Sequence, residues 1–144
     1  MTYESEREEE TFSLGFKMGK CAKAGDIYSL TGDLGTGKTV FTAGFAKGLA
    51  INTPICSPTF TIMQVYDEGR LPLYHFDVYR IDDEDEMHEI GLDDFLFGSG
   101  VCLIEWGEKI DTLLPEGTVR ILIEKDLDAG FDFRRITIDD SFSN

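Results

Sequence analysis

Apolar residues occur in short runs along the chain, separated by glycine, proline and acidic residues. Two of these runs follow helical spacing. The first predicts a helix that Thr11 caps and Gly25 ends, and the second predicts a helix that opens near Lys38. The apolar positions are Leu14, Met18, Cys21 and Ala22 in the first run, and Phe41, Phe45 and Leu49 in the second.

Other apolar runs are short enough to be strands. Residues 27–31 are typical of a short buried strand. Residues 101–106 form a continuous apolar run that ends in a carboxylate, which is consistent with a strand buried on both faces. Two pairs of runs, each joined by a turn-like segment, predict antiparallel neighbours: 60–66 with 73–77, and 119–123 with 136–138. Between these pairs, the acidic segment 82–89 predicts the solvated start of a helix that packs through Ile90, Leu92, Phe95 and Leu96.

Composition is ordinary for a folded protein, with 42% hydrophobic and 12% aromatic residues, but the net charge of −15 is not. Such a charge repels nucleic-acid backbones, so it argues against DNA or RNA binding over a broad face. It suits a basic protein partner, or simply keeps a small protein soluble. Three cysteines without metal-ligand spacing, no signal peptide and no membrane-length apolar run predict a cytoplasmic protein.

The strongest chemical motif follows the predicted strand 27–31 and opens the helix near Lys38. It reads Gly32, Asp33, Leu34, Gly35, Thr36, Gly37, Lys38 and Thr39. Its glycines allow backbone N–H groups to face phosphate oxygens, and the helix adds its positive N-terminal end. Lys38 would reach the β- and γ-phosphates, and the Thr39 hydroxyl would reach Mg²⁺. The motif therefore predicts a P-loop that binds a nucleoside triphosphate and magnesium.

The P-loop and the alternation of helices with strands predict an α/β fold. We expect a P-loop NTPase-like three-layer sandwich, with a mostly parallel sheet and antiparallel edge strands. The 144 residues contain no visible repeat or long linker, so residues 1–144 are expected to form a single domain with flexible extreme termini.

Two carboxylates end predicted strands. Glu105 ends the run 101–106, where it could bind Mg²⁺ as a second ligand, act through a water, or polarise the attacking water. Asp77 ends its own strand and either orients water near the metal or merely faces solvent. Ser57-Pro58-Thr59 is either a loop that senses the γ-phosphate or a proline turn. His75 and His88 lack ligand spacing and are assigned no chemistry. The segment 108–111 lacks the asparagine of a guanine-reading motif, which favours ATP over GTP.

Four motifs together resemble the TsaE (YjeE) family, the P-loop ATPases of bacterial tRNA threonylcarbamoyladenosine biosynthesis. In order, they are the P-loop at 32–39, Ser-Pro-Thr-Phe at 57–60, His-Phe-Asp-Val-Tyr-Arg at 75–80 and Leu-Ile-Glu-Trp at 103–106. The resemblance implies an enzyme that binds ATP with Mg²⁺ and hydrolyses it slowly alone. It also implies docking on the TsaB–TsaD pair, which modifies the adenosine beside the anticodon of tRNA. The protein would then contact tRNA only indirectly, through the complex.

The resemblance also implies residue roles. Lys38 matches the phosphate-binding lysine, Thr39 and Glu105 match the metal-linked residues, and Asp77 matches a residue needed for hydrolysis. The nucleotide-proximal positions of the family correspond to Thr59 and Trp106, and its adenosine contacts to the region from Glu8 to Thr11. Thr36 departs from the usual Ala or Ser, and its extra methyl group is expected to crowd the loop slightly.

Two other functions fit the P-loop. A small-molecule kinase would need an acceptor pocket and lid arginines, but the six arginines are scattered, and only Arg80 lies in a motif. A nucleotide-sensing module would bind without useful hydrolysis, and partners would not accelerate its phosphate release. With no clear arginine finger in the chain, we expect hydrolysis to be slow until a partner supplies charge or positions Asp77.

Overall fold

The computed structural model describes residues 1–33, 35–56 and 62–139. Leu34 and Thr59 of the predicted site, and the Ser57-Pro58-Thr59 segment, lie outside these residues. The described part contains β1 (Thr2–Ser5), α1 (Glu8–Cys21), β2 (Ile27–Thr31), α2 (Lys38–Gly48), β3 (Met63–Tyr66), β4 (Leu73–Asp77), α3 (Asp85–Glu89), α4 (Leu92–Leu96), β5 (Val101–Glu105), the 3-10 helix η1 (Gly107–Leu113), β6 (Val119–Lys125) and β7 (Arg134–Asp139).

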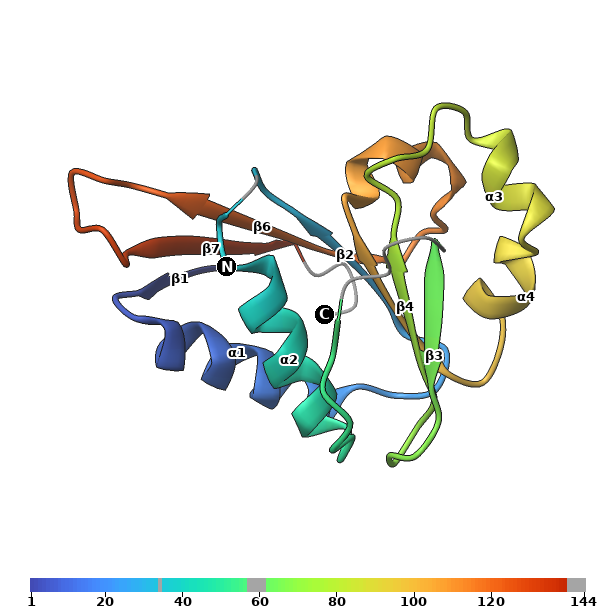
Figure 1. Ribbon diagram of the computed structural model, residues 1–144, viewed down its shortest axis with the longest axis horizontal. Coiled ribbons are helices and arrows are strands. Elements are labelled where there is room, and N and C mark those ends of the chain that lie inside the picture. Colours follow the sequence, from blue (N-terminus) through green and yellow to red (C-terminus); the bar gives the residue numbers. More distant parts are fainter. Residues whose placement is uncertain (34, 57–61, 140–144) are drawn as a thin grey trace.

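The strands form one seven-stranded sheet in the order β1-β7-β6-β2-β5-β4-β3 (Figure 1). Its centre is parallel, because β2 pairs in parallel with both β5 and β6, and β4 pairs in parallel with β5. Its edges are antiparallel through the pairs β1–β7, β6–β7 and β3–β4. The predicted parallel sheet with antiparallel edges is therefore confirmed, as are the two predicted antiparallel pairs.

Helices cover both faces of this sheet. In β5 every residue is buried, and alternate residues enter different cores. Val101 and Leu103 pack in the core that includes Phe41 and Phe45 of α2, whereas Ile104 and Cys102 pack in the core of α3 and α4. This alternation follows from the two-residue period of a strand, and it confirms the predicted three layers. Figure 1 shows α1 and α2 on one side of the sheet, with α3 and α4 on the other.

Four glycines bring α1 and α2 into backbone contact. A Cβ atom at Gly15 would lie 2.3 Å from the Phe41 carbonyl oxygen, and one at Gly19 would lie 2.0 Å from that of Phe45. In α2, Gly44 and Gly48 meet α1 backbone oxygens just as closely, at 2.1 and 2.3 Å. Both helices thus carry a Gly-x-x-x-Gly pair at the contact, a feature that the analysis of apolar spacing did not identify.

Several predicted boundaries were wrong. Thr11 does not cap α1: the helix begins at Glu8, and the buried Thr11 hydroxyl lies 2.8 Å from that of Ser5. The first turn is stabilised instead by its three glutamates, which face the positive helix end. The helix also ends before Gly25, at Cys21. The acidic helix is two short helices, because Gly91 has a left-handed backbone between them. The strand β1 was not predicted.

Among the described residues, no helix is both long and apolar enough to cross a membrane.

Candidate functional site

The P-loop connects β2 to α2, as predicted. Gly32, Gly35 and Gly37 all have positive φ angles, of 146°, 76° and 102°. Gly37 is the N-cap residue of α2, so the loop turns directly into the helix and leaves the first backbone N–H groups of α2 facing outward. The side chain of Thr36 is buried, and its hydroxyl donates to the Asp33 carbonyl at 2.8 Å, which closes a turn within the loop.

Lys38 begins α2 and folds back over the loop. Its ammonium donates to the carbonyl oxygens of Gly32 and Asp33, at 2.5 and 2.8 Å, and lies 4.2 Å from the centre of the Trp106 ring. Burial lowers the pKa of Lys38, and surrounding carboxylates, first among them Glu105, act in the opposite direction. The predicted Trp106 thus touches the P-loop lysine. Its backbone is left-handed, with φ of 63°, immediately after β5.

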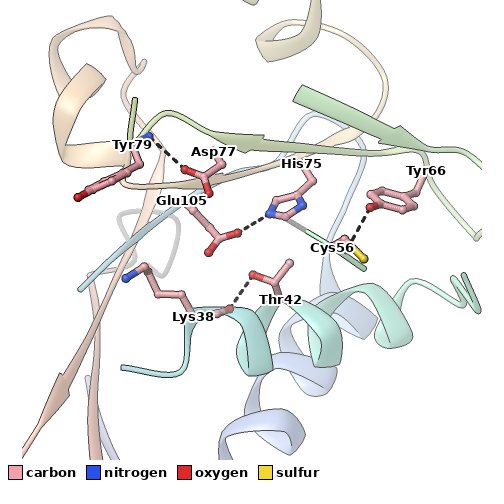
Figure 2. Close-up of polar contacts among 8 residues, drawn as sticks. All are labelled: Lys38, Thr42, Cys56, Tyr66, His75, Asp77, Tyr79 and Glu105. Carbon is pink, nitrogen blue, oxygen red and sulfur yellow. Dashed lines mark hydrogen bonds and ion pairs between the residues drawn. The ribbon is translucent and has the colours of Figure 1, made fainter. Parts of the chain in front are cut away.

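Two predicted carboxylates, Asp77 and Glu105, lie side by side at the ends of β4 and β5. The parallel register pairs Asp77 with Glu105, and both strands end beside the P-loop, above α2 (Figure 2). Glu105 has the same strand parity as Leu103, so it points toward the α2 side of the sheet. The register of the sheet therefore brings two carboxylates that are distant in the sequence to the neighbourhood of Lys38.

The Asp77 carboxylate accepts a hydrogen bond from the Tyr79 backbone N–H at 3.1 Å. Burial raises the pKa of Asp77, and this backbone hydrogen bond partly opposes the rise; the nearby charge of Glu105 raises it further. Asp77 is consequently a carboxylate whose proton affinity is increased by the site, as expected of a group that orients or accepts a proton from water.

His75, to which the sequence assigned no chemistry, contacts Glu105. Its Nε2 lies 2.6 Å from the Glu105 carboxylate oxygen Oε2, and both side chains are at most 4% exposed (Figure 2). His75 precedes Asp77 by two residues, so strand alternation puts both side chains on the same face of β4. That two-residue spacing was the signal in the sequence that could have identified His75.

A pocket of about 340 Å³ lies at the mouth of the P-loop. It brings together eight of the predicted residues, and Val40, Asp132 and Arg134 line it with them. The eight are Glu8, Thr11, Gly35, Gly37, Lys38, Thr39, Asp77 and Glu105. A larger cavity, of about 820 Å³, lies between α1 and the β1–β7 edge, but it contains none of the predicted site residues. The chemistry-bearing side chains therefore converge on the smaller pocket.

Arg134 and Asp132 were missed by the sequence analysis, which singled out Arg80 instead. Arg134 begins β7 and donates through Nε to the Thr36 carbonyl of the P-loop at 2.8 Å. Its Nη1 donates to the carbonyls of Phe131 and Phe133, so the guanidinium ties the β6–β7 hairpin to the loop. No local pattern marks Arg134, because the contact spans 98 positions of the chain.

The donor set fits a magnesium ion bound jointly with phosphates. Thr39 and Glu105 present a hydroxyl and a carboxylate to the same pocket, and hard oxygen ligands are those that Mg²⁺ prefers. In the part of the chain that the structure describes, no group of three or more His, Cys, Asp or Glu side chains could hold a metal alone. This agrees with an ion that takes one or two protein ligands and completes its shell with substrate oxygens and water.

Comparisons with known proteins identify the family of the chain. The model of the family described as threonylcarbamoyl adenosine biosynthesis protein TsaE matches residues 5–135. The Bacillus subtilis tRNA threonylcarbamoyladenosine biosynthesis protein TsaE is 50% identical over 129 residues, which cover 90% of this chain and 78% of that protein. The Treponema pallidum protein of the same name is 45% identical over 113 residues, which cover 78% and 83%.

A solved structure is similar over nearly the whole chain. The crystal structure of Bacillus subtilis YdiB aligns with a TM-score of 0.79 and 41% identity, and the alignment covers 96% of this chain and 83% of that one. The family model and the solved structure thus both match nearly the whole chain. The chain belongs to the TsaE family of tRNA threonylcarbamoyladenosine biosynthesis proteins.

Proposed function

We propose that this protein is an ATPase that binds ATP with Mg²⁺, hydrolyses it slowly alone, and supports tRNA threonylcarbamoyladenosine modification by docking on TsaB–TsaD in the cytoplasm. The observation that carries the ATPase proposal is the convergence of Lys38, Thr39, Asp77 and Glu105 on one pocket at the P-loop. Together they supply three roles in phosphoryl transfer: phosphate binding by Lys38, metal binding by Thr39 and Glu105, and the positioning of water by Asp77.

Each of these side chains has a step to perform. The loop amides and the N-terminus of α2 bind the phosphates, and Lys38 exchanges its two loop carbonyls for phosphate oxygens. Thr39 and Glu105 would hold Mg²⁺, and the bound ion would supply positive charge to the phosphates. Asp77 orients the attacking water, helped by a raised proton affinity. Glu8 and Thr11 lie at the α1 side of the pocket, where they can contact the nucleoside.

The arginine at the pocket supports slow intrinsic hydrolysis. Arg134 is the only arginine among the described residues that line the pocket, and its Nε and Nη1 are already bonded to three backbone carbonyls. In this arrangement it holds the loop and does not reach toward a γ-phosphate. An arginine or another cation from a partner would supply the missing charge, and such additions typically accelerate P-loop hydrolysis by about 10³-fold or more.

The same observation weighs against the kinase alternative. Kinases built on a P-loop clamp the transferred group with several arginines, whereas this pocket has one described arginine, which is engaged elsewhere. The net charge of −15 fits docking on a basic protein surface, and tRNA would then be approached only through the complex.

The test combines two variants with a matched control. Lys38→Ala should weaken ATP binding by about 100-fold, because it removes a charged hydrogen-bond donor from the phosphates. Asp77→Ala should retain binding and lose hydrolysis. Lys47→Ala, an exposed lysine on the same helix, should change neither. Binding is measured by calorimetry, and phosphate release is measured with and without purified TsaB–TsaD.

Tight ATP binding by Lys38→Ala would contradict the role of the loop. A turnover rate that TsaB–TsaD leaves unchanged would contradict partner-dependent hydrolysis and favour a nucleotide-sensing module.

A further inference from the structure

Glu105 of the proposed metal site forms a buried pair with His75, which has no role in the chemistry described so far. Glu105 is 3% exposed, and a carboxylate removed from water needs a hydrogen-bond donor to remain charged. Among the described residues its carboxylate has one such partner, the Nε2 atom of His75 at 2.6 Å. The bond engages only Oε2, so the second carboxylate oxygen is available on a residue that lines the pocket.

The sheet builds this pair with a fixed geometry. Parallel pairing sets Asp77 opposite Glu105 and His75 opposite Leu103, so His75 reaches Glu105 along a diagonal between adjacent strands. Both strands have neighbours on each side in the sheet, and the imidazole is itself 1% exposed. Neither side chain can change rotamer without leaving a buried polar group unpaired, so the carboxylate is held in one orientation.

The other imidazole nitrogen defines the tautomer. Nδ1 of His75 is buried and has no hydrogen-bond partner among the described residues. A lone pair left unpaired there costs less than an unpaired N–H, so the ring hydrogen is carried on Nε2, which donates it to Glu105 and orients the carboxylate.

We propose that His75 is a positioning residue: its Nε2–H holds one oxygen of Glu105 so that the other faces the magnesium ion. This inference rests on the proposed function, because it assigns His75 to the metal site of the ATPase. In a purely structural role, the same hydrogen bond would only satisfy two buried polar groups. The two roles differ in what they do to metal-dependent binding.

The experiment measures the affinity for a fluorescent, non-hydrolysable ATP analogue in Mg²⁺ and in EDTA. The ratio of the two affinities reports the metal contribution and does not depend on turnover. In His75→Asn the amide stops near the position of Nδ1 and cannot reach Glu105. The ratio should fall by about tenfold, as for other residues that orient metal ligands, while the affinity in EDTA stays the same.

Two further variants isolate the hydrogen bond. His75→Gln places an amide nitrogen near the position of Nε2 and should keep the ratio within about threefold of the wild-type value. His88→Asn, at the exposed histidine of α3, is the matched control and should behave as wild type. If circular dichroism shows that the Asn variant is unfolded, His75→Leu replaces it, and the same loss is expected.

A wild-type ratio in His75→Asn would overturn the inference, and so would a loss in His75→Gln as large as that in His75→Asn. Equal affinities in Mg²⁺ and EDTA for the wild-type protein would refute the proposed metal site and this inference together. If the wild-type affinity depends strongly on Mg²⁺ and His75→Asn has the same ratio, only this inference is refuted and the proposed metal site stands.

Discussion

The contact between α1 and α2 makes Gly19→Ala a sharp test of the fold that supports the site. A Cβ atom at this position would lie 2.0 Å from the Phe45 carbonyl oxygen, whereas ordinary contact begins at 3.4 Å. The helices would have to move apart by the difference, 3.4 − 2.0 = 1.4 Å. Because the obstacle is backbone, no side chain can rotate to make room.

The expected loss of stability follows from two opposing effects. Overpacking of a close contact costs about 3 kcal/mol at the upper end of its usual range, and alanine regains about 1 kcal/mol through its better helix propensity. The net loss is about 2 kcal/mol. An unfolding entropy of about 2 cal/mol/K per residue gives roughly 0.3 kcal/mol/K for a domain of this size, so the melting temperature should fall by about 7 °C.

Calorimetry of Gly19→Ala is compared with Ser13→Ala, which adds alanine to the exposed side of the same helix. Ser13→Ala should leave the melting temperature unchanged or raise it slightly, since serine is the poorer helix former. If Gly19→Ala melts at or above the wild-type temperature, the helices do not approach each other as closely as described. The reasoning would then fail for all four interface glycines.

Two other predictions concern titratable groups. Asp77→Asn should raise the melting temperature at pH 7, because burial raises the pKa of this carboxyl and so makes its ionised form unfavourable in the folded protein. The cost of the ionised form is complete above the raised pKa of the folded protein and vanishes below the unfolded pKa of about 3.9. The gain in melting temperature should therefore shrink as the pH falls. A gain that does not depend on pH would contradict this explanation. Burial raises the pKa of the Cys102 thiol to about 12, whereas Cys21 and Cys56 are exposed. At pH 8, Ellman's reagent should titrate two thiols rapidly in the folded protein and the third only in denaturant; three rapid thiols would refute the burial of Cys102.

The sequence was sufficient to predict the central architecture because its signals there are local. A continuous apolar run such as 101–104 indicates a strand buried on both faces. A glycine-rich loop that ends in Lys-Thr between a strand and a helix is typical of phosphate binding. The edge strand β1 lacked such a signal: its residues Thr2–Ser5 are mostly exposed and polar, and only pairing with β7 makes them a strand. The glycines of α1 and α2 were overlooked because helical periodicity is read from apolar side chains, and glycine has no side chain to count.

Site residues could be predicted where a sequence motif determines their role. They could not be predicted where only a tertiary contact brings them to the site. Lys38 and Thr39 follow from the P-loop itself. Glu105 and Asp77 follow from their positions at strand ends, but their adjacency depends on the β4–β5 register, which no local pattern gives. Arg134 reaches the P-loop from the last strand, and only the completed sheet brings them together.

The β6–β7 hairpin carries a feature that neither packing nor the loop motif explains alone. Lys125 and Arg134 are directly opposite in its register, and like charges in that position destabilise a sheet. Both reach the P-loop: a Cβ atom at Gly35 would lie 3.3 Å from the Lys125 ammonium, and one at Gly37 would lie 3.9 Å from Arg134 Nε. In a chain with a net charge of −15, these two cations make the rim of the P-loop locally positive, which favours the anionic phosphates of the proposed nucleotide.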